Sequence, residues 1–124
     1  MFVDLYIEDA NHKMPRSRLD DSIYAAVIES FVIVATDVLL VNLLRRTIYL
    51  AKRRVKPMQG WWVIGGRSYA GEVPEESMRR CFMNETSLDF PEERFKLLGI
   101  IRYMFSVRQQ EPQDIGSDNL SYIF

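Results

Sequence analysis

The sequence of 124 residues has one cysteine and a net charge close to zero. The first excludes internal disulfides, and the second argues against a general nucleic-acid-binding protein. With Cys81 alone, the chain forms no internal disulfide, which is typical of a reducing compartment and predicts a cytoplasmic location. The 16 Lys and Arg residues nearly balance the 17 Asp and Glu residues, leaving a formal charge of -1. This balance argues against general nucleic-acid binding, so any anion site must be a local cluster.

Long hydrophobic runs are also missing. The most apolar stretch, residues 31–44, contains Asp37 and Asn42 and is shorter than the roughly 18 to 20 apolar residues that a membrane span needs. The first nine residues lack a basic start and a small-residue cleavage site, so we expect no secretory signal and no membrane partner. The hydrophobic content of 48% is enough for the core of one domain.

The N-terminal third predicts an arm followed by a helix. Residues 1–19 show no sustained hydrophobic period, and we expect them to form an N-terminal arm. Asp20 or Asp21 then caps a short helix. The apolar positions of this helix recur at four-residue steps, at Ile23, Val27 and Phe31.

A β-hairpin is predicted next. Residues 32–41 are dense in β-branched side chains, residues 47–52 alternate, and Asn42 follows the first of these strands. Asp37 is expected to interrupt the first strand. Further strands are expected at residues 61–64, at residues 95–105 and from residue 121 onward, with a polar loop at 109–114.

A glycine pair and a helix follow the strand at 61–64. Gly65 and Gly66 let the backbone approach a ligand without an intervening side chain. Pro74, followed by two glutamates, is a favourable start for a helix that should run to about Thr86. We expect Glu85 to lie on this helix beside a partly apolar side that includes Met78 and Phe82.

Residues 65–88, with the sequence GGRSYAGEVPEESMRRCFMNETSL, resemble a Nudix box, whose consensus is G-x5-E-x7-R-E-U-x-E-E-x-G-U with U apolar. Cys81 and Asn84 replace two carboxylates of the consensus, and Ser87 replaces its last glycine. The positions that agree are Gly66, Glu72, Arg80, Phe82, Glu85 and Leu88.

This resemblance implies the Nudix fold, an α+β fold in which a mixed β-sheet is sandwiched between α-helices. It places a Nudix domain at residues 20–124, after the arm at residues 1–19. Because the fold needs further strand and usually a C-terminal helix, we expect the C-terminal part of the domain to be missing.

The flanking residues are most similar to the GDP-mannose mannosyl hydrolase branch of this superfamily. The similar features are the Lys52-Arg53 pair, residues 57–62, the turn at 65–67 and the step at 83–85. The branch also lacks the same two box carboxylates. The resemblance therefore implies Mg²⁺-dependent hydrolysis of a nucleoside diphosphate sugar by a homodimer, with water attacking the anomeric carbon and releasing free sugar.

The resemblance also assigns roles to individual residues around the metal and the diphosphate. One Mg²⁺ ion, with Mn²⁺ as a substitute, would be held by Glu85 and the carbonyl of Gly65. Arg53 and Arg67 would lie at the diphosphate, where a planar donor fork is suited to binding phosphate oxygens. Gly66 matches the first glycine of the box consensus. Arg80 would orient carboxylates, and Glu72 would accept structural hydrogen bonds.

At the sugar and base, the resemblance implies that Asp37 lies on the sugar side and that Tyr122 supports the leaving group. Trp61 or its neighbour Trp62 would stack on the base or sugar, with one of the two in the core. The general base of the branch is a histidine beyond residue 124, whereas the single histidine, His12, belongs to the arm. We therefore expect this 124-residue form to be inactive or nearly so.

Alternative interpretations remain for both residues and function. Asp37 equally fits a turn or a bulge, and the cations between residues 45 and 56 equally fit a solvated strand edge. Two further functions are a non-catalytic nucleotide-sugar binding module and a nucleotide pyrophosphohydrolase. The carboxylates lost at Cys81 and Asn84 disfavour the last, because attack on phosphorus in this family uses two or three metal ions.

Overall fold

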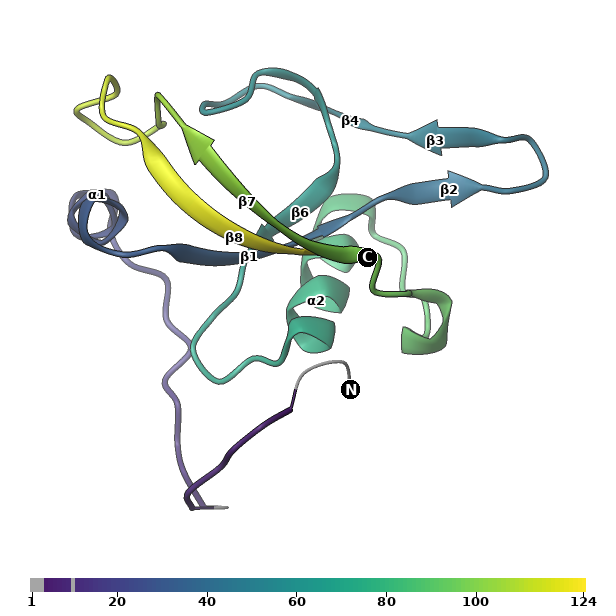
Figure 1. Cartoon of the computed structure of the whole chain (residues 1–124), viewed down its shortest axis with the longest axis horizontal. Helices are drawn as coiled ribbons and strands as arrows, with labels where there is room; N and C mark the ends of the chain where they lie inside the picture. The colour runs from purple at the N-terminus through teal and green to yellow at the C-terminus, as the bar shows by residue number, and fades with distance from the viewer. Residues whose placement is uncertain (1–3, 10) are drawn as a thin grey trace.

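A computed structural model describes residues 4–9 and 11–124, and this part of the chain folds as a mixed α+β structure (Figure 1). The expected fold class is confirmed. The elements are α1 (Asp21–Ser30), β1 (Ile33–Val38), β2 (Leu40–Asn42), β3 (Thr47–Tyr49), β4 (Ala51–Arg53), β5 (Gly60–Trp62), β6 (Ile64–Arg67), α2 (Pro74–Thr86), the 3-10 helix η1 (Glu92–Arg94), β7 (Gly99–Phe105) and β8 (Ser117–Ile123).

The main sheet has the strand order β6-β1-β8-β7 and is mixed. Strand β1 runs antiparallel to β6 and parallel to β8, and β8 runs antiparallel to β7. Asp37 pairs with Gly65 on one side and Ile123 on the other, so β1 continues through it to Val38. The expected interruption at Asp37 is therefore wrong, because neighbouring strands hold the backbone of this residue in the sheet.

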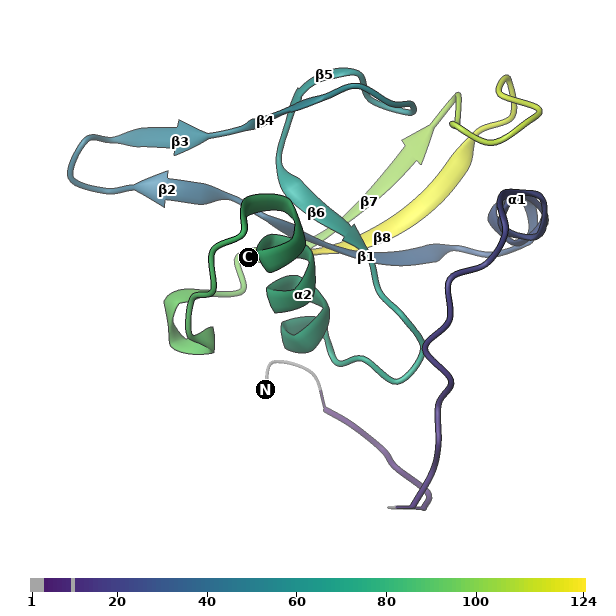
Figure 2. The same ribbon diagram turned by 180° about the vertical axis from the view of Figure 1, so that it is seen from behind.

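Two short strand pairs flank the main sheet. The predicted hairpin forms only in part: β2 pairs with β3, and the two strands project away from the body at the end opposite α1 (Figure 2). Most of the expected first strand, residues 33–38, belongs to the main sheet as β1. The strand expected at residues 61–64 is instead divided between two sheets. It pairs with β4 as far as Trp62 and joins β1 from Ile64 onward.

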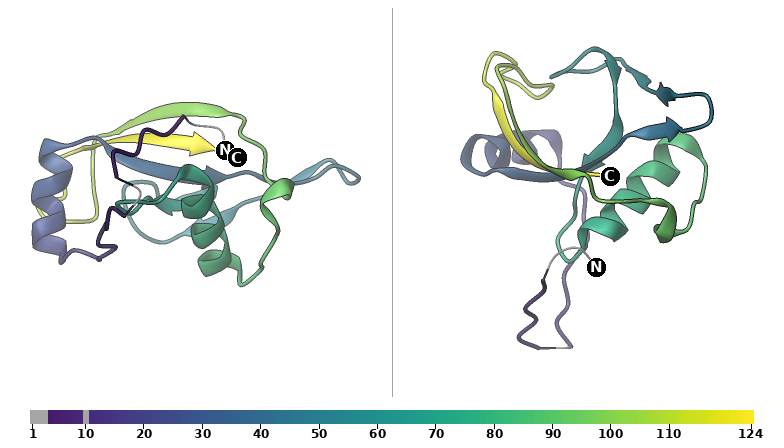
Figure 3. Two further views of the ribbon diagram at one scale, coloured as in Figure 1. Left: turned by 90° about the horizontal axis from the view of Figure 1, so that it is seen from below. Right: turned by 45° about the vertical axis from the view of Figure 1, so that its right-hand side comes forward.

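Helix α2 has the boundaries predicted from the sequence and lies across one face of the main sheet (Figure 3). Pro74 occupies its first turn, and the Glu76 carboxylate accepts the Val73 backbone N–H at 3.4 Å. The helix ends at Thr86, and the capping residue after it, Ser87, has a left-handed φ of 59°. A glycine suits that conformation best, which accounts for the glycine of the consensus at this position.

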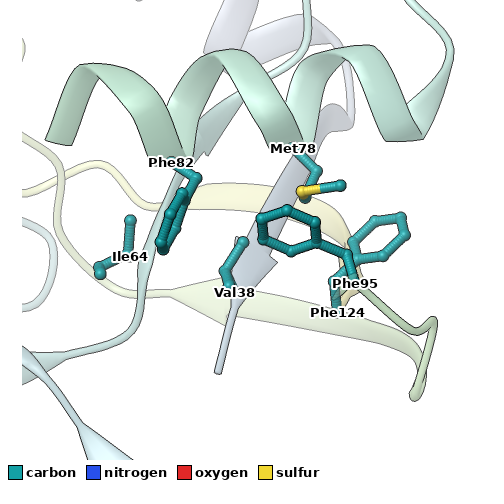
Figure 4. Packing of buried hydrophobic residues seen from close by; sticks show 6 residues of the cluster. All are labelled: Val38, Ile64, Met78, Phe82, Phe95 and Phe124. Carbon is teal, nitrogen blue, oxygen red and sulfur yellow. The ribbon is translucent and has the colours of Figure 1, made fainter. Parts of the chain in front are cut away.

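The core lies between α2 and the sheet (Figure 4). Phe82 contacts Phe95 edge to face, with the ring centroids 5.3 Å apart, and Phe90 at the same centroid distance. The buried cluster consists of Val38, Ile64, Met78, Phe82, Phe95 and Phe124. Glu85 does not join it. It is exposed, because the last turn of α2 lies beyond the two helix residues that enter the core.

Helix α1 forms where the sequence predicted it, but with a different buried face. Ala25 and Ile28 are buried, whereas Ile23 and Phe31 are 53% and 67% exposed. Two of the three residues in the apolar repeat are therefore exposed, and the third, Val27, is half-buried. Tertiary contacts selected the side around Ala25, whose carbonyl receives a hydrogen bond from the buried Arg108 at 3.2 Å.

The last two strands also differ from the sequence prediction in their starting points. Strand β7 begins at Gly99 and not at residue 95, because Phe95 turns into the core directly after η1. Strand β8 begins at Ser117 and not at residue 121, because its polar first residues pair with β7. The pattern of apolar residues alone does not reveal strand residues that have polar side chains and are held by backbone hydrogen bonds.

The described residues of the N-terminal arm, 4–9 and 11–19, form no helix or strand. Residues 1–3 and 10, which the predicted arm also includes, lie outside the described residues. Arg16 attaches the arm to the body, because it donates to the Gly71 carbonyl at 3.1 Å and to Glu76 at 3.2 Å. Neither α1 nor α2, the α-helices of the described chain, has the length and apolar character needed to cross a membrane.

Candidate active site

The face of the main sheet opposite α2 carries a cleft of about 410 Å³. Strand alternation creates the two faces, since Thr36 bonds to Ser77 on α2 while its neighbour Asp37 lines the cleft. The charged lining residues are Arg18, Asp21, Asp37, Arg53, Lys56, Arg67 and Arg108, and the aromatic ones are Tyr24, Trp62, Tyr103 and Phe105. This combination of excess positive charge and aromatic rings suits an anionic ligand that carries a planar ring.

Asp37 is buried, and its Oδ2 accepts a hydrogen bond from the Ser121 hydroxyl at 2.5 Å. Burial raises the pKa of Asp37, although the Ser121 hydrogen bond and the charge of Arg53 act in the opposite direction. Gly65 faces it from β6, and a Cβ there would overlap the Asp37 carboxylate and the Thr36 carbonyl. In the cleft, the buried carboxyl group of Asp37 therefore lies against the backbone of Gly65, with no side chain between them.

Arg53 lines the cleft and is held by its own loop. Its Nε donates to the Val55 carbonyl at 3.3 Å, and its Nη2 donates to the Lys56 carbonyl at 3.4 Å. Lys56 connects this loop to the 106–116 loop, because its Nζ lies 2.6 Å from Oε1 of Gln113. The two loops therefore form one wall of the cleft.

Arg67 reaches the same cleft from β6. Its guanidinium lies over the ring of Tyr24, 3.9 Å from the ring centroid. Its backbone carbonyl accepts a hydrogen bond from Arg80 at 2.9 Å. The structure thus brings Arg53, Arg67 and Asp37, together with Gly65 and Gly66, into one site.

Glu72 and Arg80 form a two-pronged ion pair beside this site. Arg80 donates from Nε to Glu72 Oε1 at 2.6 Å and from Nη2 to Oε2 at 2.8 Å. The Tyr69 backbone N–H adds a third bond to Glu72 at 2.8 Å, and the Tyr69 ring lies 4.2 Å from the Arg80 guanidinium. Burial raises the pKa of Glu72, but these hydrogen bonds outweigh it and hold the pKa below its ordinary value.

We expect Glu72→Gln to lower the free energy of unfolding by about 1 to 2 kcal/mol at neutral pH. Since the folded-state pKa is lowered, the contribution of the Glu72 charge is fully present above the ordinary value of 4.5 and is lost as pH falls through the folded-state pKa. Urea unfolding of both proteins across pH 2.5–7 measures this difference. A gap that stays constant to the lowest pH would contradict an ionised Glu72 as its source.

Glu85, the predicted metal ligand, lies on the last turn of α2 and does not line the cleft. It lies one helical turn beyond Cys81, whose Sγ would be 3.1 Å from a Cβ added to Gly66. The described residues contain no group of three or more His, Cys, Asp or Glu side chains that could hold a metal. A single exposed carboxylate such as Glu85 offers oxygen ligands for at most one Mg²⁺, a cation that also keeps several waters.

The two predicted aromatic contacts lie elsewhere. Tyr122 packs against the core cluster, on the α2 side of the sheet, while the adjacent Ser121 points towards Asp37. Trp61 is 66% exposed beside Lys52, whose Nζ is 6.0 Å from its ring centroid. Trp62 lines the cleft and meets Tyr103 edge to face at 5.7 Å.

Several lining residues were missed by sequence reasoning. Arg18, Asp21 and Tyr24 precede the residues on which the resemblance rests. Arg18 belongs to the predicted arm, and Asp21 and Tyr24 belong to a helix whose apolar repeat indicated another face. Arg108 is a single arginine in a polar loop, where no spacing marks it. The two tryptophans before Gly65 indicated an aromatic side chain at the site, but only strand pairing decides which of the two lines the cleft.

Comparison with known proteins is consistent with this architecture. The family model of the NUDIX domain matches residues 33–124. No curated protein matches the chain.

Two similar solved structures have related folds. A MutT/nudix family protein from Enterococcus faecalis superposes with a TM-score of 0.52 at 17% identity, covering 77% of this chain and 38% of that one. The Ap4A hydrolase of C. elegans gives a TM-score of 0.51 at 13% identity, covering 75% of this chain and 67% of that one. This chain therefore spans well under half the length of the first structure, and identities this low show the fold alone.

Proposed function

Because this chain belongs to the NUDIX domain family, we propose that it is a Mg²⁺-dependent hydrolase of a nucleoside diphosphate sugar. Members of this family are hydrolases that act on nucleotide-derived substrates and generally use divalent metals. The observation that carries the finer proposal is the composition of the site. Arg53 and Arg67 share the cleft with the buried Asp37, whereas the box helix has lost carboxylates at Cys81 and Asn84.

This composition favours attack on carbon over attack on phosphorus. Attack on phosphorus in this family draws on several metal ions and therefore on several carboxylates. Here Glu72 is bound to Arg80 and Glu76 to Arg16, while Glu85 has no ion pair with a described residue. A reaction in which arginines neutralise the departing diphosphate needs fewer metal ligands, because positive charge alone stabilises the leaving group.

In the proposed reaction, a water oxygen forms a bond to the anomeric carbon, and the bond from that carbon to the diphosphate oxygen breaks. The nucleoside diphosphate leaves with the electron pair, and the attacking water releases its proton to the solvent. Arg53 and Arg67 donate to the diphosphate oxygens, where charge accumulates. Glu85 and the Gly65 carbonyl would hold a Mg²⁺ ion, which would supply further positive charge at the diphosphate.

The remaining cleft residues fit the other two parts of such a substrate. Asp37 faces the sugar, where its raised pKa favours a carboxyl group that exchanges protons or hydrogen bonds with a hydroxyl. Trp62 and Tyr103 present rings to the base. A GDP-linked hexose as substrate, the homodimer and the cytoplasmic location stay predictions from the resemblance and the composition.

The test is hydrolysis of GDP-mannose with Mg²⁺ in ¹⁸O-labelled water, at protein concentrations in excess of substrate. We expect the label in free mannose, because the water attacks carbon. Label in a phosphate of mannose 1-phosphate or of GMP would mean attack on phosphorus, the reaction of a pyrophosphohydrolase. Because the activity of this 124-residue form is expected to be low, the enzyme hypothesis predicts at most a slow single turnover. Mg²⁺-dependent binding of GDP-mannose with no labelled product, even in this excess of protein, would support the non-catalytic binding module instead.

A further inference from the structure

One wall of the cleft comes from residues that precede the segment matched by the family model. The match begins at residue 33, yet Arg18, Asp21, Tyr24 and Ile28 all line the cleft. Three of them belong to α1, which lies at the end of the sheet opposite the β2–β3 hairpin (Figure 1). The site therefore includes a helix outside the matched segment.

Tyr24 makes the most direct contact between this helix and the proposed chemistry. Its ring centroid is 3.9 Å from the Arg67 guanidinium carbon, and both side chains are half-buried. Arg67 makes no side-chain hydrogen bond or ion pair with another described residue, so the tyrosine ring is its support. A cation over an aromatic face is attracted by the negative ring surface, and more strongly where water is partly excluded.

The same pair separates two hollows. Tyr24 and Arg67 line both the main cleft and a neighbouring groove of about 430 Å³ between α1 and the loop at residues 68–72. Without the ring, the guanidinium would be free to turn from the cleft into this groove. Stacking on Tyr24 therefore keeps the Arg67 guanidinium in one position, on the side of the main cleft and not in the groove.

Helix α1 is itself fixed at the turn that carries Tyr24. The Arg108 side chain is 1% exposed and donates to the Ala25 carbonyl at 3.2 Å and to Glu29 at 2.6 Å. It also donates to the carbonyls of Gln110, Glu111 and Pro112 at 3.1 Å each. A buried arginine with this many partners holds α1 and the 106–116 loop as one unit.

We propose that Tyr24 is a positioning residue, which holds the Arg67 guanidinium in the cleft for contact with the substrate diphosphate. This inference rests on the proposed function, since it assigns the diphosphate to Arg67. The part of Tyr24 that acts is the ring and not the hydroxyl, because the contact is made over the ring face. Helix α1 thereby becomes part of the substrate site.

The test compares Tyr24→Leu with Tyr24→Phe by calorimetric titration of GDP in the presence of Mg²⁺. Loss of the ring should weaken GDP binding by roughly 2- to 30-fold, the range that cation–π contacts span. Tyr24→Phe should stay within about twofold of the parent. Tyr49→Leu, at a half-exposed tyrosine of β3 away from the cleft, serves as the matched control.

A double-mutant cycle shows whether Tyr24 acts through Arg67. With Arg67→Met present, Tyr24→Leu should have no further effect on GDP affinity. A full additional loss in that background would overturn the inference, as would a Tyr24→Phe variant that binds as weakly as Tyr24→Leu. Thermal unfolding of each variant identifies any that fail to fold.

A second readout separates this inference from the proposed function. Phenylglyoxal labelling of Arg67, followed by peptide mass spectrometry without nucleotide, reports how accessible the guanidinium is. Labelling should be faster in Tyr24→Leu and unchanged in Tyr24→Phe, and equal rates in all three proteins would refute the stacking role. If Arg67→Met leaves GDP affinity unchanged, the diphosphate assignment fails whatever the labelling shows.

Discussion

Glu85→Gln should abolish the Mg²⁺ dependence of GDP-mannose binding and lower any turnover by roughly 10²- to 10³-fold. The amide keeps the shape of the side chain but removes the negative charge that a divalent cation requires. Glu85 is exposed and makes no ion pair with a described residue, so its removal should leave folding intact. The measurement is Mg²⁺ titration of GDP-mannose binding, followed by the fluorescence of the two tryptophans, of which Trp62 lines the cleft.

Glu93→Gln is the matched control for this experiment. Glu93 is an exposed glutamate of η1, outside both α2 and the cleft, and its substitution should change neither metal dependence nor turnover. Unaltered Mg²⁺ dependence in Glu85→Gln would remove Glu85 from the metal site. Glu72→Gln would then be tested as the metal-site variant, because Glu72 is the other box carboxylate. Glu72 is already ion-paired with Arg80.

Gly65→Ala should lower the free energy of unfolding by about 3 kcal/mol or more, the upper end of the cost of overpacking. A Cβ at this position would overlap the Thr36 carbonyl oxygen and the Asp37 carboxylate, and it would lie 2.8 Å from the Asp37 Cα. Most of these neighbours are backbone atoms of the central strand, which cannot move without breaking the pairing of β1 with β6. Urea unfolding followed by circular dichroism measures the loss.

Gly99→Ala tests whether the loss comes from crowding or from the change of residue type. Gly99 lies in β7 of the same sheet, and a Cβ there would meet nothing within 4 Å. Its substitution should therefore change stability by about 0.5 kcal/mol at most, or raise it slightly through the unfolded chain. Equal losses at the two glycines would show that the close approach of Gly65 to Asp37 does not limit stability.

Local sequence determined the elements whose signals are local. Pro74 and the acidic residues after it determine the start of α2, and the box spacing indicated the Glu72 and Arg80 positions that the structure joins in an ion pair. The β-branched run before Asn42 predicted strand structure for the same reason, because strand preferences act between neighbouring residues. Only the end of the run, from Leu40, pairs as the hairpin. The family followed from the same box motif.

Tertiary structure decided which side chains face each other across the sheet. Trp61 and Trp62 are equivalent in sequence, but the pairing of β4 with β5 leaves the first exposed and turns the second into the cleft. Tyr122 and Ser121 are separated in the same way, since a shift of one residue reverses strand facing. The side of the sheet on which a side chain lies depends on pairing with a strand distant in sequence. The periodicity of one chain segment therefore does not predict it.

The same reason explains why α1 entered the site unpredicted. Its apolar repeat indicated a face on which Ile23 and Phe31 remain exposed. Arg108, 83 residues after Ala25, instead fixes the buried face, which places Tyr24 against Arg67. The sequence by itself determined the family, the helices and the charged residues available to the cleft. The fold alone decided which of them meet, because contacts between segments distant in sequence fix orientation and local propensity does not.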